Sequence, residues 1–299
     1  SDQFLNTLIE TKSPLLLVGS LLTLAGFLFK ITAVPFHLWA PDVYESAPTP
    51  VVAFLSVVPK LAGIVILVKV VLAIQLFGQS GFPWQSILAV ISMLSILVGN
   101  LSALAQTNPK RMLAYSSVAQ SGFLLIGLAV LGMEGIHFLM FYSAAFLIMN
   151  FLVFSVLNQY ESSLVADSVS SFTGLGRLSF FPAFSMLIGM IALTGLPPTA
   201  GFTAKLLIFS SLWSTYQETQ SGILLALFVI GLINTVVSLF FYLKIPYFLF
   251  MKEPVVDTRP IKNSYSSNLL HGILVILLIY LFLQPGVLMG WINRITFVL

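Results

Sequence analysis

The chain contains no cysteine and very little charge. Without cysteine it cannot form disulfides, thiolate metal sites or cysteine-ligated iron–sulfur clusters. Lys, Arg, Asp and Glu make up only 8% of its 299 residues, against about a quarter in globular proteins, whereas 58% are hydrophobic. This composition is typical of a polytopic membrane protein, and no basic run indicates nucleic-acid binding. We therefore expect the lipid bilayer, and no nucleic acid, around it.

Motifs for metal, nucleotide or redox chemistry are also missing. The sequence has no His-x-x-x-His pair and no acidic cluster with metal-ligand spacing. The run Gly174-Leu175-Gly176 follows no strand and is too short for a nucleotide fingerprint. His137 and His271 stand alone at segment ends, which favours ordinary interfacial histidines. We predict that this chain holds no cofactor, no metal and no catalytic residue.

What the chain does have is long apolar runs. Runs of about 20 residues predict transmembrane helices, which satisfy their own backbone hydrogen bonds in lipid. The expected fold class is an all-α membrane helix bundle, forming one transmembrane domain over residues 1–299. A window of about 20 residues gives eight segments: 13–34, 50–76, 84–105, 111–132, 136–158, 179–214, 222–250 and 266–290.

Basic residues divide unequally between the two sides of these segments. Counted from the N-terminus, one side carries Lys12 and Arg294. The other carries Lys110, Arg111, Arg177, Lys252, Arg259 and Lys262. By the positive-inside rule the second side is expected to be cytoplasmic or matrix-facing, with both chain ends on the opposite side.

Two lysines lie deep inside apolar segments. Lys60 is about ten residues into its segment, or roughly 15 Å, near the middle of a hydrocarbon core about 30 Å thick. A charge at that depth costs at least about 2.5–3.5 kcal/mol, which points to a function for Lys60 and Lys205. Lys69 has the pattern of a snorkelling interfacial lysine, and depth alone leaves Lys30 and Lys244 undecided.

The segment 179–214 predicts a broken helix. As one helix it would be about 54 Å long, far more than a bilayer needs. The break is expected at Gly195-Leu196-Pro197-Pro198, and Lys205 follows it by two turns. Irregular backbone at membrane depth is tolerated where protein buries it or it lines a wet cavity, and discontinuous helices commonly mark ion sites.

The other lysines also lie near prolines. Pro59 frees the carbonyl of Leu55 beside the ammonium group of Lys60. The first segment, with Lys30, runs into a proline-rich stretch near Pro35 that forbids a long regular helix. That stretch is also the most titratable patch of the chain, with three ionisable residues: His37, Asp42 and Glu45.

A desolvated lysine can gain and lose a proton near neutral pH, so these residues suit a proton relay. Hydroxyl and amide side chains inside the segments could bridge them, although interhelical hydrogen bonding is the favoured role of each one alone. These side chains are Tyr115, Ser116, Ser117, Tyr142, Ser143, Asn150 and Asn234.

Three runs resemble a known family. They are GFLFKITAVPFHLWAPDVYESAPTPVVAFLSVVPK (26–60), GNLSALAQTNPKRMLAYSSVAQSGFLLIGL (99–128) and LTGLPPTAGFTAK (193–205). They resemble the antiporter-like membrane subunit of respiratory complex I, which is NADH-quinone oxidoreductase subunit N in bacteria and subunit 2 in mitochondria. The likeness extends over essentially the whole chain. It implies that Lys30, Lys60 and Lys205 lie on a proton path. His37, in the titratable patch that follows Lys30, is a further candidate.

The resemblance implies a proton-translocating membrane-arm subunit that couples NADH:quinone electron transfer to pumping, in a mitochondrial or bacterial inner membrane. NADH, FMN, iron–sulfur clusters and quinone are then expected on other subunits, and a neighbouring antiporter-like subunit as a partner. Two alternatives stay open. One is a subunit of a multisubunit cation/proton antiporter, and the other is a structural subunit whose lysines only bond carbonyls freed by prolines.

Family members have further helices, including an early one with an essential glutamate. The eight segments of this chain correspond to their C-terminal part, and none places an Asp or Glu in mid-membrane. We therefore expect the N-terminal helices to be absent from this chain. The acidic partner of Lys30 is then expected to come from elsewhere, either from a companion chain or from an N-terminal half removed from this one.

Overall fold

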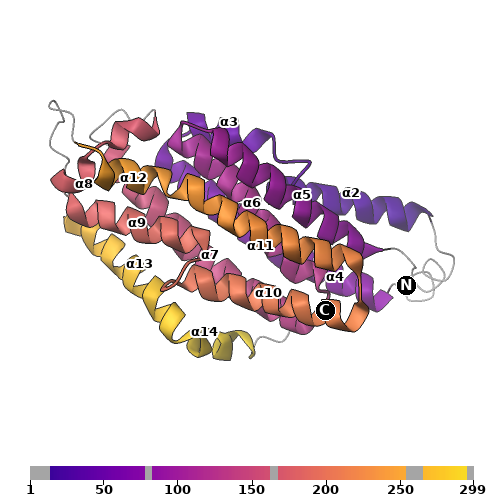
Figure 1. Cartoon of the computed structure of the whole chain (residues 1–299). Helices are drawn as coiled ribbons and strands as arrows, with labels where there is room; N and C mark the ends of the chain where they lie inside the picture. Colours follow the sequence, from indigo (N-terminus) through magenta and orange to yellow (C-terminus); the bar gives the residue numbers. More distant parts are fainter. Residues whose placement is uncertain (1–13, 78–82, 162–167, 254–264, 295–299) are drawn as a thin grey trace.

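The computed structural model describes residues 14–77, 83–161, 168–253 and 265–294. These residues form an elongated bundle in which long helices run side by side (Figure 1), and no strand occurs within the described ranges. The long helices are α4 (Thr49–Phe77), α5 (Trp84–Ala105), α6 (Pro109–Ala129), α7 (Met133–Glu161), α10 (Ala200–Thr219), α11 (Gly222–Tyr242) and α13 (Tyr265–Leu283).

The predicted fold class is confirmed. In the part of the chain that the structure describes, six helical stretches are long and apolar enough to cross a membrane. Two shorter apolar helices, Val18–Lys30 and Phe180–Thr194, accompany them. The molecule is a polytopic membrane helix bundle, and each of the eight predicted segments contains at least one helix.

Both predicted helix breaks are present. α2 (Pro14–Lys30) ends before Pro35 and a turn leads into α3 (Trp39–Ser46). α9 (Phe180–Thr194) stops at Gly195, and α10 begins at Ala200. α4 remains one helix through Pro59.

Two further interruptions were not predicted. The segment 222–250 divides into α11 and α12 (Lys244–Met251), and 266–290 divides into α13 and α14 (Pro285–Ile292). Pro246 falls in the first turn of α12 and Pro285 is the first residue of α14, positions where a missing N–H costs nothing inside the helix.

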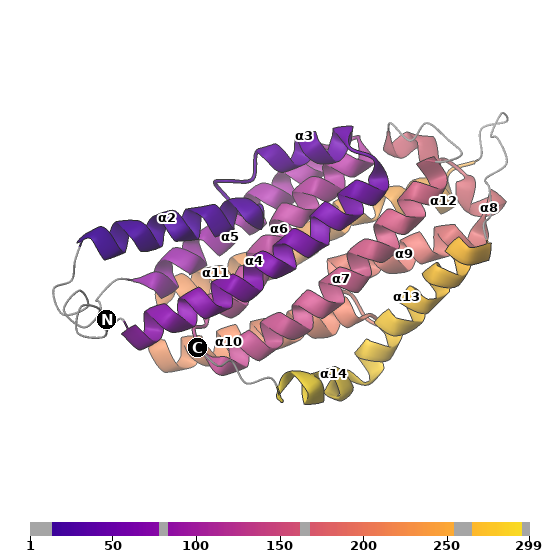
Figure 2. The ribbon, with the colours of Figure 1, turned by 180° about the vertical axis from the view of Figure 1, so that it is seen from behind.

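α6 is the central helix of the bundle. Every residue from Ser116 to Ala129 is buried, and α6 contacts α3, α4, α5, α7 and α10. α5 and α6 approach closely because glycines face the neighbouring backbone: a Cβ built on Gly122 would lie 2.8 Å from the nitrogen of Ile96. α2 lies at one edge of the bundle, at the upper left of Figure 2.

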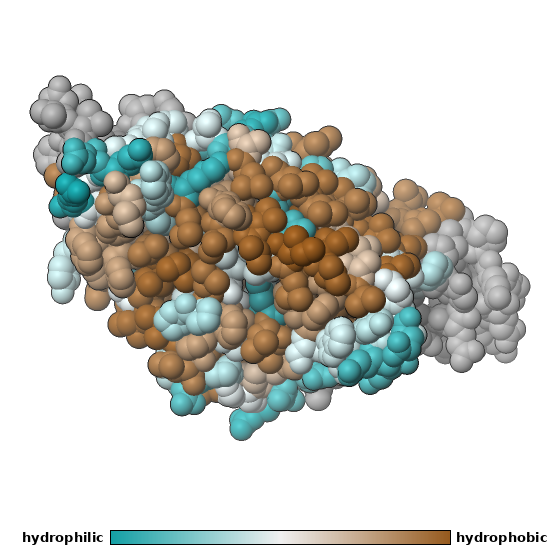
Figure 3. All heavy atoms as spheres, viewed as in Figure 1, coloured by the Kyte–Doolittle hydropathy of each residue, from teal (hydrophilic) through white to brown (hydrophobic). Residues whose placement is uncertain are grey.

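The outer faces are apolar. Figure 3 shows a broad hydrophobic band across the molecule, with hydrophilic residues mostly toward its ends. α11, at the front of Figure 1, exposes large apolar side chains along this band. They are Val229, Leu232, Ile233, Val236 and Phe240. Such a surface suits lipid or another membrane helix.

Several charged residues and short connecting helices lie together at one end of the bundle. Lys110, at the start of α6, forms an ion pair with Glu161 at the end of α7, at 3.3 Å. The short helices η1 (Val169–Phe172) and α8 (Leu175–Leu178) pack against α12 at this end. Four of the basic residues counted together for orientation lie here, namely Lys110, Arg111, Arg177 and Lys252, whereas Lys12, Arg259 and Lys262 lie outside the described residues.

The crossing of α9 and α10 yields a first prediction. A Cβ at Gly201 would collide with the carbonyl oxygen of Ala192 and lie 3.0 Å from the sulfur of Met149. We expect Gly201→Ala to destabilise the fold by about 1–3 kcal/mol, measured as a lower thermal unfolding temperature of the purified protein. Gly222→Ala is the control, because nothing lies within 4 Å of its Cβ position. Equal stability of the two variants would contradict this packing.

Candidate functional site

The helix breaks leave specific backbone carbonyls without donors. In an α-helix the N–H of each residue donates to the carbonyl four residues earlier, and proline has no N–H. Pro35 therefore cannot serve the carbonyl of Ile31. The hydroxyl of Ser121 in α6 donates to that carbonyl instead. The same turn is held from α5, where Ser95 Oγ accepts the N–H of Val34 at 3.0 Å.

The second break has two such carbonyls. Pro197 and Pro198 remove the donors that a continuous helix would offer to Leu193 and Thr194. Two side chains replace them, one from α6 and one from α10. Gln120 Nε2 donates to the Leu193 oxygen at 2.9 Å. Lys205 Nζ donates to the Thr194 oxygen at 2.7 Å.

Lys60 is fully buried and its three donors are all used. Its ammonium group donates to Thr32 Oγ1, to the Ser117 oxygen at 2.8 Å and to Ser121 Oγ at 3.0 Å. The sequence pointed to the carbonyl of Leu55 as its neighbour, but the ammonium group instead reaches α6 and the turn after α2. Thr32 is held there in the left-handed region at φ 60°, a strained conformation for a β-branched residue.

Lys205 is buried in a different way. Its ammonium group lies 4.4 Å from the centroid of the Phe123 ring on α6, a cation–π contact, in addition to its bond to Thr194. Its stem passes Gly195, where a Cβ would lie 2.6 Å from Lys205 Cδ. Gly195 also has φ 84°. Glycine therefore suits this turn twice, because it adopts a positive φ without strain and leaves room for the Lys205 side chain.

α6 contacts both lysines, with two serines at Lys60 and the ring of Phe123 at Lys205. Ser117 and Ser121, four residues apart on one face, meet Lys60. Gln120 lies one residue from Ser121 and so points about 100° away, toward the second break. Its Nε2 also donates to Tyr242 of α11 at 3.1 Å, and its Oε1 accepts from Tyr142 of α7.

The other two predicted site residues lie outside this network. Lys30 is the last residue of α2, exposed, with its stem beside Gly63 of α4 and no hydrogen bond to any described residue. His37 is buried in the turn between α2 and α3, and its Nδ1 has no hydrogen-bond partner among the described residues. Burial lowers the pKa of His37, because desolvation disfavours the charged imidazolium.

Some of the predicted bridging residues take part and some do not. Ser116 and Tyr142 belong to the network around α6 through their hydroxyls, whereas Ser117 enters it only through its backbone oxygen. Asn150 bonds only a carbonyl of its own helix, and Asn234 pairs with Asn100 at 3.3 Å. The sequence reasoning missed five participants, Thr32, Gln120, Ser121, Thr194 and Tyr242. The repeat S-S-x-x-Q-S at 116–121 was a usable signal, because polar residues four apart share a helix face.

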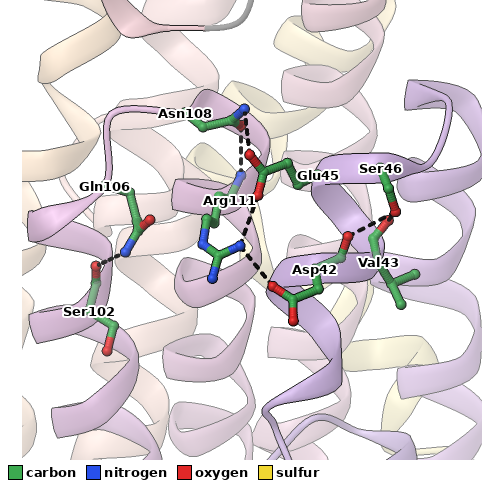
Figure 4. A network of polar contacts seen from close by, with 8 residues as sticks. All are labelled: Asp42, Val43, Glu45, Ser46, Ser102, Gln106, Asn108 and Arg111. Carbon is green, nitrogen blue, oxygen red and sulfur yellow. Dashed lines mark hydrogen bonds and ion pairs between the residues drawn. The ribbon is translucent and has the colours of Figure 1, made fainter.

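The titratable patch forms an ion-pair network at the end of the bundle. Figure 4 shows Arg111 of α6 pointing at two carboxylates of α3, Asp42 at 2.7 Å and Glu45 at 2.8 Å. Asn108 caps α6 by accepting the N–H of Arg111 at 3.1 Å and also reaches Glu45. These contacts fix α3 across the start of α6. Within the described ranges no group of three His, Cys, Asp or Glu residues could hold a metal ion.

Comparison with known proteins decides the family. The model of the transmembrane family of NADH:quinone oxidoreductases and Mrp antiporters matches residues 3–250. The chain belongs to this family. The resemblance seen in the three sequence runs is therefore confirmed, and so is the membrane-helix fold that it implied.

Individual members of the family are similar over most of the chain. NADH-quinone oxidoreductase subunit N 2 of Chloroherpeton thalassium is 41% identical over 274 residues, which cover 90% of this chain and 52% of that protein. NAD(P)H-quinone oxidoreductase subunit 2 of Synechocystis sp. is 40% identical over 248 residues, covering 83% and 46%. The chain thus spans about half the length of these relatives.

Solved structures with a similar fold belong to respiratory and antiporter complexes. A chain of respiratory complex I from Thermus thermophilus with bound aureothin is 32% identical, with a TM-score of 0.74, covering 89% of this chain and 57% of that one. A chain of the Mrp complex from Dietzia sp. has a TM-score of 0.84 at 20% identity, covering 97% and 61%. The second likeness concerns the fold alone.

The network in Figure 4 gives a second prediction. Arg111→Gln removes two solvent-exposed ion pairs, each contributing about 0.2–1 kcal/mol. We expect a small loss of thermal stability at low ionic strength that shrinks in high salt, because salt screens exposed charges. The exposed Arg177, which forms no ion pair with a described residue, provides the control Arg177→Gln. A loss that is the same at all salt concentrations would contradict the assignment.

Proposed function

We propose that this chain is part of a proton-translocating membrane-arm subunit of respiratory complex I, with Lys60 and Lys205 as proton carriers. The observation that carries the proposal is the pair of buried ammonium groups on two faces of one polar helix, α6. Residues 1–299 would form a single transmembrane domain that corresponds to the C-terminal eight helices of the subunit.

The surroundings of the lysines support proton transfer. Neither Lys60 nor Lys205 forms an ion pair with a carboxylate among the described residues, so only neutral groups compensate for the desolvation of the charge. The proposal requires each lysine to alternate between its charged and neutral forms. Lys60 also touches the hydroxyls of Ser121 and Thr32, groups that both accept and donate hydrogen bonds.

Lys30 and His37 complete the proposed path at its edge. Lys30 is exposed at the end of α2, where a helix of another segment could bring a carboxylate to it. We place that segment in the part of the subunit outside residues 1–299, whether on this polypeptide or on a companion chain, or in a neighbouring antiporter-like subunit. His37, buried in the turn that follows, is the next titratable group along the chain.

The names of the relatives support this assignment. They are subunits of NADH-quinone oxidoreductases, with 36–41% identity in examples such as those of Chloroherpeton thalassium and Moorella thermoacetica. NADH, FMN, iron–sulfur clusters and quinone would bind to other subunits, with this chain in a bacterial or mitochondrial inner membrane. The Mrp antiporter alternative has weaker support, because that likeness is 20% in sequence. Co-purification with NADH-oxidising activity separates the two.

Replacement of Lys60 tests the proposal directly. Lys60→Met keeps the length and apolar volume of the side chain but cannot carry a proton. We expect proton pumping by the assembled enzyme to fall by roughly tenfold or more, measured as proton uptake into vesicles during NADH oxidation. Lys69→Met on the exposed face of the same helix is the matched control and should leave pumping intact. Unchanged pumping in Lys60→Met with normal assembly would sink the role of Lys60.

Replacement of Lys205 separates proton transfer from a structural role. The bond from Lys205 to the carbonyl freed by Pro198 is what the structural alternative requires. Lys205→Gln retains an N–H donor for Thr194 but no titratable group. We expect Lys205→Gln to assemble normally and to lose pumping, as Lys205→Met does. If Lys205→Gln pumps normally while Lys205→Met fails to assemble, the structural role is correct.

A further inference from the structure

Two adjacent residues of α6 each donate a hydrogen bond to a free carbonyl at one of the two helix breaks. Ser121 donates to the Ile31 carbonyl at the end of α2, and Gln120 donates to the Leu193 carbonyl at the end of α9. Both side chains are buried, with exposed fractions of 0% and 1%. The two breaks are separated by about 160 residues of sequence, yet their free carbonyls are served by neighbours on a single helix.

Neither bond is easily replaced. Both carbonyls lack a helical donor because a proline follows four residues later, and a buried carbonyl without a partner is costly where water is excluded. Gln120 is itself fixed by Tyr142 and Tyr242, from α7 and α11. Its amide group therefore has little freedom to leave the Leu193 oxygen.

Ser121 connects its break to Lys60. Its hydroxyl has one hydrogen and two acceptors within reach, the Ile31 oxygen and the Ser117 oxygen of its own helix at 3.0 Å. A charged Lys60 donates to both Ser121 Oγ and the Ser117 oxygen, which directs the hydroxyl hydrogen to Ile31. A neutral Lys60 offers a lone pair that can accept this hydrogen and release the Ile31 carbonyl. This step rests on the proposed function, because it requires Lys60 to change its protonation state.

We propose that Gln120 and Ser121 are positioning residues that couple the two helix breaks through α6. α6 is buried along this stretch and closely packed against α5, so a shift at one residue displaces its neighbour. A change in the hydrogen bonds of the first break is thereby transmitted to the turn that holds Lys205. The ends of α2 and α9 would then change together, and the hydrogen bonds of Lys60 and Lys205 would each influence that change.

Hydrogen exchange in the complex as isolated from the membrane tests this coupling. Ser121→Ala removes the donor at the first break, and Gln120→Leu removes the donor at the second. Each variant should speed amide exchange at its own break, in segments 27–33 or 190–196, by about three- to tenfold. The decisive expectation is the reciprocal one: each variant also speeds exchange at the other break, which its side chain does not touch, by about twofold or more.

Matched controls are available inside the bundle. Ser211→Ala and Asn150→Leu remove buried polar groups that bond only carbonyls of their own helices. These variants should leave exchange at both breaks unchanged. Ser121→Thr keeps the hydroxyl and should restore slow exchange at both breaks, which a purely volumetric effect would not do.

The outcomes separate this proposal from the proposed function. If Ser121→Ala and Gln120→Leu each affect only their own break, the coupling is overturned whatever the lysine variants do. If the reciprocal effect is present but Lys60→Met and Lys205→Met both pump normally, the coupling stands and the proposed proton path falls. Reciprocal exchange together with reduced pumping in Ser121→Ala supports both.

Discussion

The structure depends on one constraint: a backbone carbonyl that loses its helical donor at membrane depth must find another. Water is scarce there, and lipid offers no hydrogen bonds. Prolines create this need at Ile31, Leu193 and Thr194, and three side chains, of Ser121, Gln120 and Lys205, meet it. The breaks after α2 and α9 are therefore held by polar side chains of neighbouring helices, mainly of α6.

This requirement explains the unusual character of α6. A helix that is buried on all sides is normally apolar throughout, yet α6 carries Ser116, Ser117, Gln120 and Ser121 in two turns. Ser116, Gln120 and Ser121 each bond a group on another helix or in the turn after α2, and Ser117 takes part through its backbone oxygen, which accepts from Lys60. Glycines such as Gly122 let α5 approach closely, so the polar row is enclosed by tightly packed backbone.

The two buried lysines are held unequally. Lys60 uses all three of its donors on oxygen atoms, whereas Lys205 has one backbone oxygen and the face of Phe123. An ammonium group with fewer oxygen partners is less well compensated for its desolvation. The two sites thus differ in the number and kind of groups that contact the ammonium nitrogen.

The sequence by itself determined the elements and the depth of the charges. Apolar runs of bilayer length set the helices, Pro35 and Gly195-Leu196-Pro197-Pro198 set the breaks, and distance along a run placed Lys60 in mid-membrane. These are properties of local chain geometry, so they can be read without knowing which helices touch. The divisions before Lys244 and Pro285 were missed because the sequence is strongly apolar on both sides of each one, so a hydropathy window passes over them.

Only the tertiary structure decided which side chain bonds each free carbonyl. That Ile31 and Leu193 meet adjacent residues of α6 depends on how α2, α6 and α9 pack, and no local pattern encodes this pairing. The same holds for Lys30, whose exposure at the edge of the bundle follows from the position of α2. Prolines fix where donors are lost, because that is covalent chemistry, but packing alone fixes which side chain replaces them.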